Sequence, residues 1–143
     1  MLKDKLHFQI MRCFQNLNND MIKQTSNIDL SPGWPKVLEY LYERDGVLAK
    51  EICDNCYFDK STVSSILNAM EKEKLITRQK LSTDKRCSAI YLTDYGREKA
   101  EQLLPIAKSI DDFALSGVTE EEREQVFEAL QKIIDNYKRR NNE

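Results

Sequence analysis

Short polar side chains gather in one stretch of this 143-residue sequence, between residues 59 and 72. After Asp59 the stretch carries Lys60, Ser61, Thr62, Ser64, Ser65, Asn68 and Lys72. Hydroxyl and amide groups can hydrogen-bond phosphate oxygens or base edges of a nucleic acid, and lysine can pair with phosphate. The same residue types also decorate ordinary solvated helices. The elements that carry these side chains therefore decide between the two interpretations.

An apolar stripe alternates with the polar residues. Val63, Ile66, Leu67 and Met70 recur at intervals of three or four, which predicts a helix over 60–74 with one buried face. Asp59 is a favourable N-cap residue for it. Such a helix can enter the major groove of DNA, because one face is held by the protein and the other carries short hydrogen-bonding groups. Its free N-terminal amides would also attract phosphate.

A predicted β-hairpin follows this helix directly. Residues 75–80 and 87–92 have the pattern of strands, and the polar segment 82–86 joins them. We expect Arg86 to reach into a minor groove, whose negative potential favours a guanidinium, beside a basic neighbour, Lys85. Asp84 can hold that guanidinium in a bidentate contact. A solvated turn is the alternative interpretation of the same three residues.

The remaining pattern is helical. Apolar spacing and capping residues predict helices over 2–27, from Ser31-Pro32 to Asp45-Gly46, over 49–55, from Thr93 to Ser116-Gly117 with an irregularity at Pro105, and from Thr119 to the end. The expected fold class is mainly α with a small two-stranded β-wing. Apolar runs are short and the N-terminus lacks a signal-peptide pattern, so we expect a cytoplasmic protein with no membrane partner.

Charge is unevenly distributed along the chain. The net charge is −2, yet residues 60–99 hold nine Lys or Arg against five Asp or Glu. A local basic excess on an acidic protein suits contact with phosphate, because binding responds to nearby charge. The sequence thus favours double-stranded DNA as a partner.

The sequence resembles the MarR family of regulators through motifs whose order and spacing match. These motifs are Asp59-Lys60-Ser61-Thr62-Val63-Ser64, Glu71-Lys72-x-x-Leu75-Ile76, Asp84-x-Arg86 and Leu92-Thr93-x-x-Gly96, with a looser match around Leu30-Ser31-Pro32. The resemblance implies a transcriptional regulator, expected to be a repressor, that binds a pseudo-palindromic operator as a triangular homodimer. Its expected location is the bacterial cytoplasm, on the nucleoid when bound to the operator.

The resemblance also implies a division of the chain. Residues 1–30 would form an N-terminal dimerisation helix, 31–93 a winged helix-turn-helix lobe and 94–143 intertwined C-terminal dimerisation helices. By the same resemblance, Arg86 is the minor-groove arginine and Asp84 its support. The groove-facing residues are implied to be Ser61, Thr62, Ser64, Ser65 and Asn68.

Two further expectations concern specificity and ligands. Many relatives carry Arg where this chain has Ser65, so we expect a weaker or a different base readout, with Lys60 and Lys72 adding phosphate contacts. The family commonly responds to small phenolic or lipophilic ligands that release it from DNA. A pocket for such a ligand is expected at Phe14, Trp34 and Leu38, although these residue types at helical spacing also suit a core.

The sequence leaves other classes of function as alternatives. Thiol-based redox sensing would use Cys53, Cys56 or Cys87, whereas Cys13 does not match the position of the reactive cysteine in peroxide-sensing relatives, which falls near His7. A single histidine and a single Cys-x-x-Cys pair argue against a metal site. No cofactor is expected.

An interaction-only winged helix is another alternative. An enzyme is disfavoured, because the sequence lacks a Gly-rich phosphate loop and the βαβ context of thioredoxin-like exchange.

Overall fold

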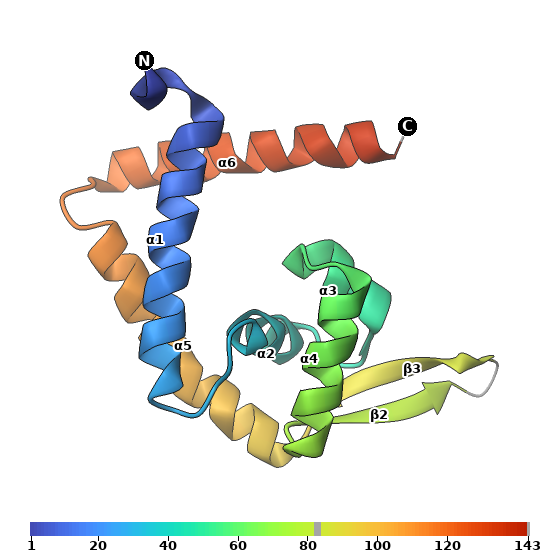
Figure 1. The fold of residues 1–143 in the computed structure, drawn as a ribbon. Helices are drawn as coiled ribbons and strands as arrows, with labels where there is room; N and C mark the ends of the chain where they lie inside the picture. Colours follow the sequence, from blue (N-terminus) through green and yellow to red (C-terminus); the bar gives the residue numbers. More distant parts are fainter. Residues whose placement is uncertain (82–83, 143) are drawn as a thin grey trace. The chain divides into compact units, whose positions relative to one another are not determined.

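The computed structural model describes residues 1–81 and 84–142, and the side chains of 82–86 lie outside this description. In chain order the elements are η1 (Leu2–Asp4), α1 (Leu6–Ser26), α2 (Trp34–Glu43), β1 (Val47–Leu48), α3 (Ala49–Cys56), α4 (Lys60–Lys72), β2 (Ile76–Leu81), β3 (Asp84–Leu92), α5 (Asp94–Ala114) and α6 (Glu120–Asn141) (Figure 1). The chain forms two compact units, Met1–Ile110 and Asp111–Glu143. In the described part of the chain, no helix has the length and apolarity needed to cross a membrane.

The antiparallel sheet has the order β1-β3-β2. The expected two-stranded wing is thus extended by a third strand, β1, in which Val47 pairs with Ile90 and Leu48 with Ala89. A two-residue strand is too short to show an alternating pattern, so sequence analysis missed it. In the wing itself, β2 and β3 form the ribbon that projects beyond α4 in Figure 1. The mainly helical fold with a small wing is confirmed.

One core holds the first unit together. Val37, Leu38 and Leu41 of α2 are fully buried and belong to a cluster with residues from α3, α4, the sheet and α5. The predicted stripe of α4 is part of this cluster, with Met70 fully buried and Ile66 only 8% exposed. Burial of apolar surface stabilises a fold by about 25 cal/mol per Å². The contact of the apolar stripe with the core therefore fixes the orientation of α4 and leaves its polar face outward.

The start of α2 differs from the prediction. Ser31 and Pro32 form a turn in which the Trp34 amide donates to the Ser31 carbonyl at 3.1 Å. Gly33 then adopts a φ of 88°, a left-handed conformation that residues inside a right-handed helix do not have. The helix therefore begins at Trp34, and Pro35 lies in its first turn, where no intrahelical donor is lost.

The second unit consists mainly of α6. The predicted capping box is present, because the Thr119 hydroxyl accepts from the Glu122 amide at 3.1 Å and the Glu122 carboxylate accepts from the Thr119 amide at 3.0 Å. Acidic residues occupy the first turn of α6 and basic residues its last turn, as the helix dipole favours. None of its residues is buried.

Candidate nucleic-acid interface

The polar face of α4 is organised from its N-terminus. The Asp59 carboxylate accepts hydrogen bonds from the Thr62 amide at 2.7 Å and the Ser61 hydroxyl at 2.9 Å. These contacts, the Thr62 amide first, lower the pKa of the Asp59 carboxyl. The predicted N-cap is confirmed, and the proton of the Ser61 hydroxyl is directed back to Asp59. The oxygen of Ser61 keeps lone pairs that can accept from another donor.

The DNA-binding residues predicted between 60 and 72 share one helix, α4. Thr62 is half-buried, while six others are exposed: Lys60, Ser61, Ser64, Ser65, Asn68 and Lys72. They lie opposite or beside the buried stripe, so the helix presents hydroxyl, amide and ammonium groups together. These side chains carry hydrogen-bond donors and acceptors and are short enough to contact base edges in the major groove of DNA.

The cap of α4 has a testable pH dependence. Because the folded-state pKa of Asp59 lies below its unfolded value, the carboxylate stabilises the fold above the unfolded pKa. This contribution is lost as the pH falls through the folded pKa. Asp59→Ala should therefore lower the melting temperature at neutral pH, and the difference from wild type should shrink in acid. Asp59→Asn is the control, because asparagine caps without titrating. A difference that stays constant with pH would contradict this role of the carboxylate.

The wing departs from the prediction in its length. The predicted turn 82–86 overlaps β3, which begins at Asp84, so the backbone of Asp84, Lys85 and Arg86 lies in a strand. An exposed ribbon tolerates polar residues on both faces, so polarity alone wrongly indicated a turn. The side chains of these three residues, and with them the expected contact between Asp84 and Arg86, lie outside the described part.

A pair that sequence analysis missed connects the wing to α4. In β2, Arg78 donates from Nη2 to the Asn68 Oδ1 atom at 3.0 Å, and both residues are exposed. Arg78 has no motif of its own in the sequence. It becomes a candidate functional residue because the fold places it beside Asn68.

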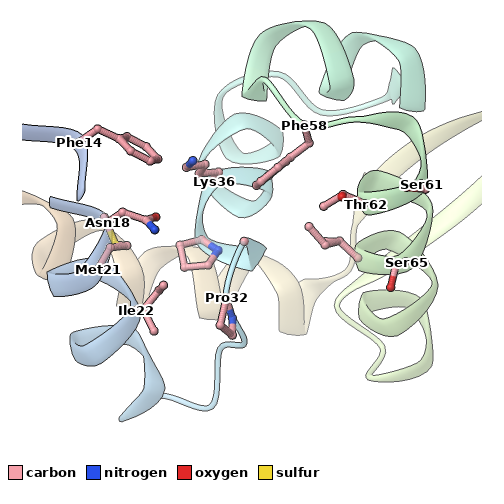
Figure 2. A pocket seen from close by; sticks show the side chains of 13 residues that line it. Phe14, Asn18, Met21, Ile22, Pro32, Lys36, Phe58, Ser61, Thr62 and Ser65 are labelled. Atoms are coloured by element: carbon pink, nitrogen blue, oxygen red, sulfur yellow. The ribbon is translucent and has the colours of Figure 1, made fainter. Parts of the chain in front are cut away.

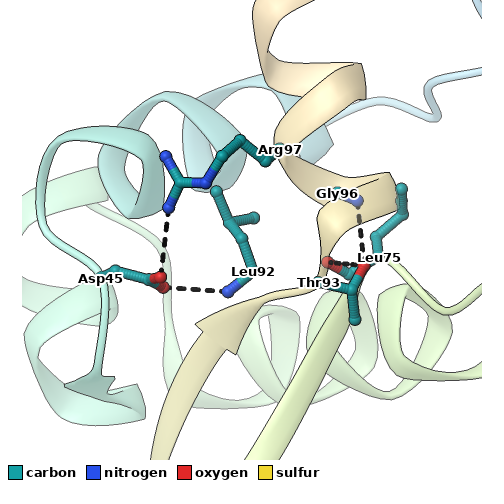
Figure 3. Close-up of polar contacts among 6 residues, drawn as sticks. All are labelled: Asp45, Leu75, Leu92, Thr93, Gly96 and Arg97. Carbon is teal, nitrogen blue, oxygen red and sulfur yellow. Dashed lines mark hydrogen bonds and ion pairs between the residues drawn. The ribbon is translucent and has the colours of Figure 1, made fainter.

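The base of the wing is held by polar contacts (Figure 3). Asp45, after α2, accepts from the Leu92 amide at 2.9 Å and from Arg97 Nη2 at 3.3 Å. The Thr93 hydroxyl caps α5 by accepting from the Gly96 amide at 2.9 Å, as predicted. It also contacts the backbone carbonyls that follow α4, with the Lys74 oxygen at 2.6 Å. These contacts join the ends of α4, β3 and the start of α5, which positions the wing relative to α4.

A pocket of about 560 Å³ opens between α1, α2 and the first turns of α4 (Figure 2). Its apolar lining includes Phe14, Met21, Ile22, Pro32, Pro35, Phe58 and Ile66. Its polar lining includes Asn18, Lys36, Ser61, Thr62 and Ser65. The Lys36 ammonium lies 4.9 Å from the centre of the Phe14 ring and 5.1 Å from that of Phe58. Among described residues, no acidic side chain lines this pocket.

The three expected pocket residues separate in the structure. Phe14 lines this pocket, whereas Leu38 is fully buried in the core. Trp34 belongs to the core and also lines a different pocket, together with Leu30 and Tyr95. Helical spacing could not distinguish a core position from a pocket wall. Lys36, which sequence analysis missed, lies with Phe14 in the wall.

The cysteines differ in their environments. Cys13 is exposed, whereas Cys53, Cys56 and Cys87 are half-buried. Burial raises the pKa of the Cys56 thiol, against an opposing effect of the Lys36 charge. A raised pKa reduces the thiolate fraction and with it the reactivity toward oxidants. In the described part of the chain, no group of three His, Cys, Asp or Glu side chains is placed to hold a metal ion.

Comparison with known proteins agrees with this geometry. The model of the MarR family matches residues 28–86, from the α1–α2 turn into the wing. The chain is 25% identical over 138 residues to the HTH-type transcriptional regulator MhqR of Bacillus subtilis (strain 168), covering 96% of this chain and 95% of that protein.

Solved structures have the same fold. A putative MarR family transcriptional regulator from Listeria monocytogenes, complexed with 26mer DNA, superposes with a TM-score of 0.88 at 21% identity, over 93% of this chain and 89% of that one. S. aureus MepR in a DNA complex gives 0.82 at 25% identity, over 92% and 98%. The cap of α4, the wing and the matched segment agree, and the chain matches the MarR family of winged helix-turn-helix transcriptional regulators over residues 28–86 and in its fold.

Proposed function

We propose that this protein binds duplex DNA sequence-specifically as a homodimer and acts as a repressor released by a small ligand. The observation that carries the proposal is the exposed polar face of α4, held outward by a buried apolar stripe beside a projecting wing. The related MepR, which shares the fold, was solved bound to DNA. A repressor is favoured because the chain is also similar to the HTH-type transcriptional repressor MdtR of Bacillus subtilis (strain 168), with 26% identity over 132 residues.

Each part of this interface has a distinct role. The hydroxyls of Ser61, Thr62, Ser64 and Ser65 and the amide of Asn68 would read or position the major groove. Lys60, Lys72 and Lys85 would contact phosphates, a contribution that weakens as salt rises. Arg86 would enter the minor groove of the operator with support from Asp84.

Dimerisation is supported by exposed apolar side chains on two helices. In the first unit, α1 exposes Leu6, Ile10, Met11, Phe14 and Leu17. In the second unit, α6 exposes Val126, Phe127, Leu130, Ile134 and Tyr137. Amphipathic helices normally bury such a face, and a large exposed apolar patch marks an interaction surface. We infer that a second copy covers these faces, with 1–30 and 94–143 as the dimerisation segments and 31–93 as the DNA-binding lobe.

The pocket beside α4 suits the proposed release. Its apolar walls would take an aromatic or lipophilic body, and Lys36 would favour a neutral or anionic polar group. Ser61, Thr62 and Ser65 belong both to the pocket wall and to the proposed DNA surface. A ligand bound there would therefore change the start of α4 directly, and its differential affinity for the free and DNA-bound states would shift the equilibrium.

The test is an anisotropy titration with duplex from the protein's own promoter region, against an unrelated duplex and at two salt concentrations. We expect tighter binding to the promoter duplex, and Arg86→Ala should weaken it by about 1–3 kcal/mol without unfolding the protein. Salicylate, a small phenolic carboxylate, is the probe for release. Equal, weak binding to both duplexes, unaffected by Arg86→Ala, would favour an interaction-only winged helix.

A further inference from the structure

The contact between Arg78 and Asn68 constrains the orientation of the Asn68 side-chain amide on α4. The two residues come from neighbouring elements, β2 and α4, and are joined at 3.0 Å. The turn between these elements is itself fixed. Lys74 adopts a φ of 63°, and the Leu75 amide donates to the Met70 carbonyl at 2.9 Å. The pair is therefore positioned by backbone geometry as well as by its own hydrogen bond.

The chemistry of this pair is directional. A guanidinium has only donors, so the Asn68 amide must turn its oxygen toward Arg78. The amide nitrogen then remains the available donor of Asn68. Bidentate recognition of adenine requires the oxygen to accept from the base N6 group while the nitrogen donates to N7. Arg78 occupies one of the two lone pairs of this oxygen and turns it toward β2, so the amide nitrogen is left to meet the groove and the bidentate pairing with adenine is disfavoured.

We propose that Arg78 is a positioning residue that sets the hydrogen-bond polarity of Asn68 and thereby its base preference. Held in this way, Asn68 offers donors to groove acceptors such as O6 and N7 of guanine. Adenine at the contacted position is disfavoured. This inference rests on the proposed DNA-binding function and identifies a specificity determinant within it.

The experiment compares base preference with overall affinity. Operator duplexes carrying each base pair at every half-site position are titrated with wild type, Arg78→Ala, Asn68→Ala and the double variant. For Arg78→Ala we expect the guanine-to-adenine ratio of Kd at one position per half-site to change by about fivefold to a hundredfold, in favour of adenine. Asn68→Ala should abolish the preference there, and adding Arg78→Ala should then change nothing more in that preference.

Two further variants separate positioning from charge. Lys80→Gln removes a positive charge from the same face of β2, two residues farther along. It should weaken binding to all duplexes alike and reduce the salt dependence, leaving the preference intact. Arg78→Lys keeps a donor and a charge and should restore part of the wild-type preference.

The results that oppose the inference are distinct. If Arg78→Ala lowers affinity equally for every duplex, and its effect multiplies with that of Asn68→Ala, Arg78 is a phosphate contact and the inference is wrong. The proposed function would survive that result. If wild type binds all duplexes equally, the proposed function itself fails, and the inference fails with it.

Discussion

Replacing Gly96 with alanine is expected to destabilise the protein by about 3 kcal/mol, although helix propensity alone predicts a gain of about 1 kcal/mol. Gly96 lies in the first turn of α5, and a Cβ atom there would fall 2.0 Å from the carbonyl oxygen of Leu75. That oxygen is backbone and accepts from the Thr93 amide at 3.0 Å. It also accepts from the Thr93 hydroxyl at 3.2 Å (Figure 3), so it cannot move away without displacing the end of α4. The same shift would disturb the wing, and DNA binding should fall with stability.

The measurement is chemical denaturation of wild type and variant at equal protein concentration, with circular dichroism as the readout. Gly117→Ala is the matched control. Gly117 has a φ of 80°, but no atom lies within 4 Å of an added Cβ. Only the left-handed conformation then opposes alanine, at a cost of about 1 kcal/mol. A Gly96→Ala variant as stable as wild type would show that α5 and the end of α4 are not in the close contact described.

Introducing charge into the exposed apolar face of α6 should convert the proposed dimer into a monomer. Phe127 is 58% exposed and Ile134 39% exposed in a helix that buries none of its residues. Phe127→Glu combined with Ile134→Glu would place two carboxylates against the apolar surface of a second copy, where desolvation opposes them. Loss of the second half-site should reduce operator affinity by about a hundredfold to ten-thousandfold, because two linked lobes bind more tightly than one.

Light scattering after gel filtration gives the mass, and the anisotropy titration gives the affinity. Gln125→Glu is the control, because it adds a carboxylate to the opposite face of the same helix at 100° per residue. It should leave mass and affinity unchanged. A doubly substituted protein that remains dimeric and binds the operator normally would exclude this face of α6 from the dimer interface.

The sequence predicted the elements whose causes are local. Asp59 as the cap of α4, Thr93 as the cap of α5 and the Thr119–Glu122 capping box are interactions over three residues, and the structure confirms all three. The apolar stripe of α4 follows from helical periodicity and is buried as predicted. That the polar residues on the outer face of α4 contact DNA stays a prediction.

The predictions that failed required knowledge of neighbours distant in sequence or of a backbone conformation. Strand β1 exists only because β3 lies beside it, and Leu38 is a core residue only because other elements cover it. The start of α2 depended on the left-handed conformation of Gly33. The Asp45–Arg97 contact spans 52 positions of the sequence, a separation at which no local pattern exists.

Capping and periodicity thus determined the helices and the polar face of α4 from the sequence by itself, because both act within one or two helical turns. Tertiary structure alone decided that Arg78 meets Asn68, that a carbonyl of Leu75 leaves no room at Gly96 and that Lys36 lies between two aromatic rings. These contacts depend on how rigid elements pack. Packing is determined by the whole core together, so the spacing of individual residues does not reveal it.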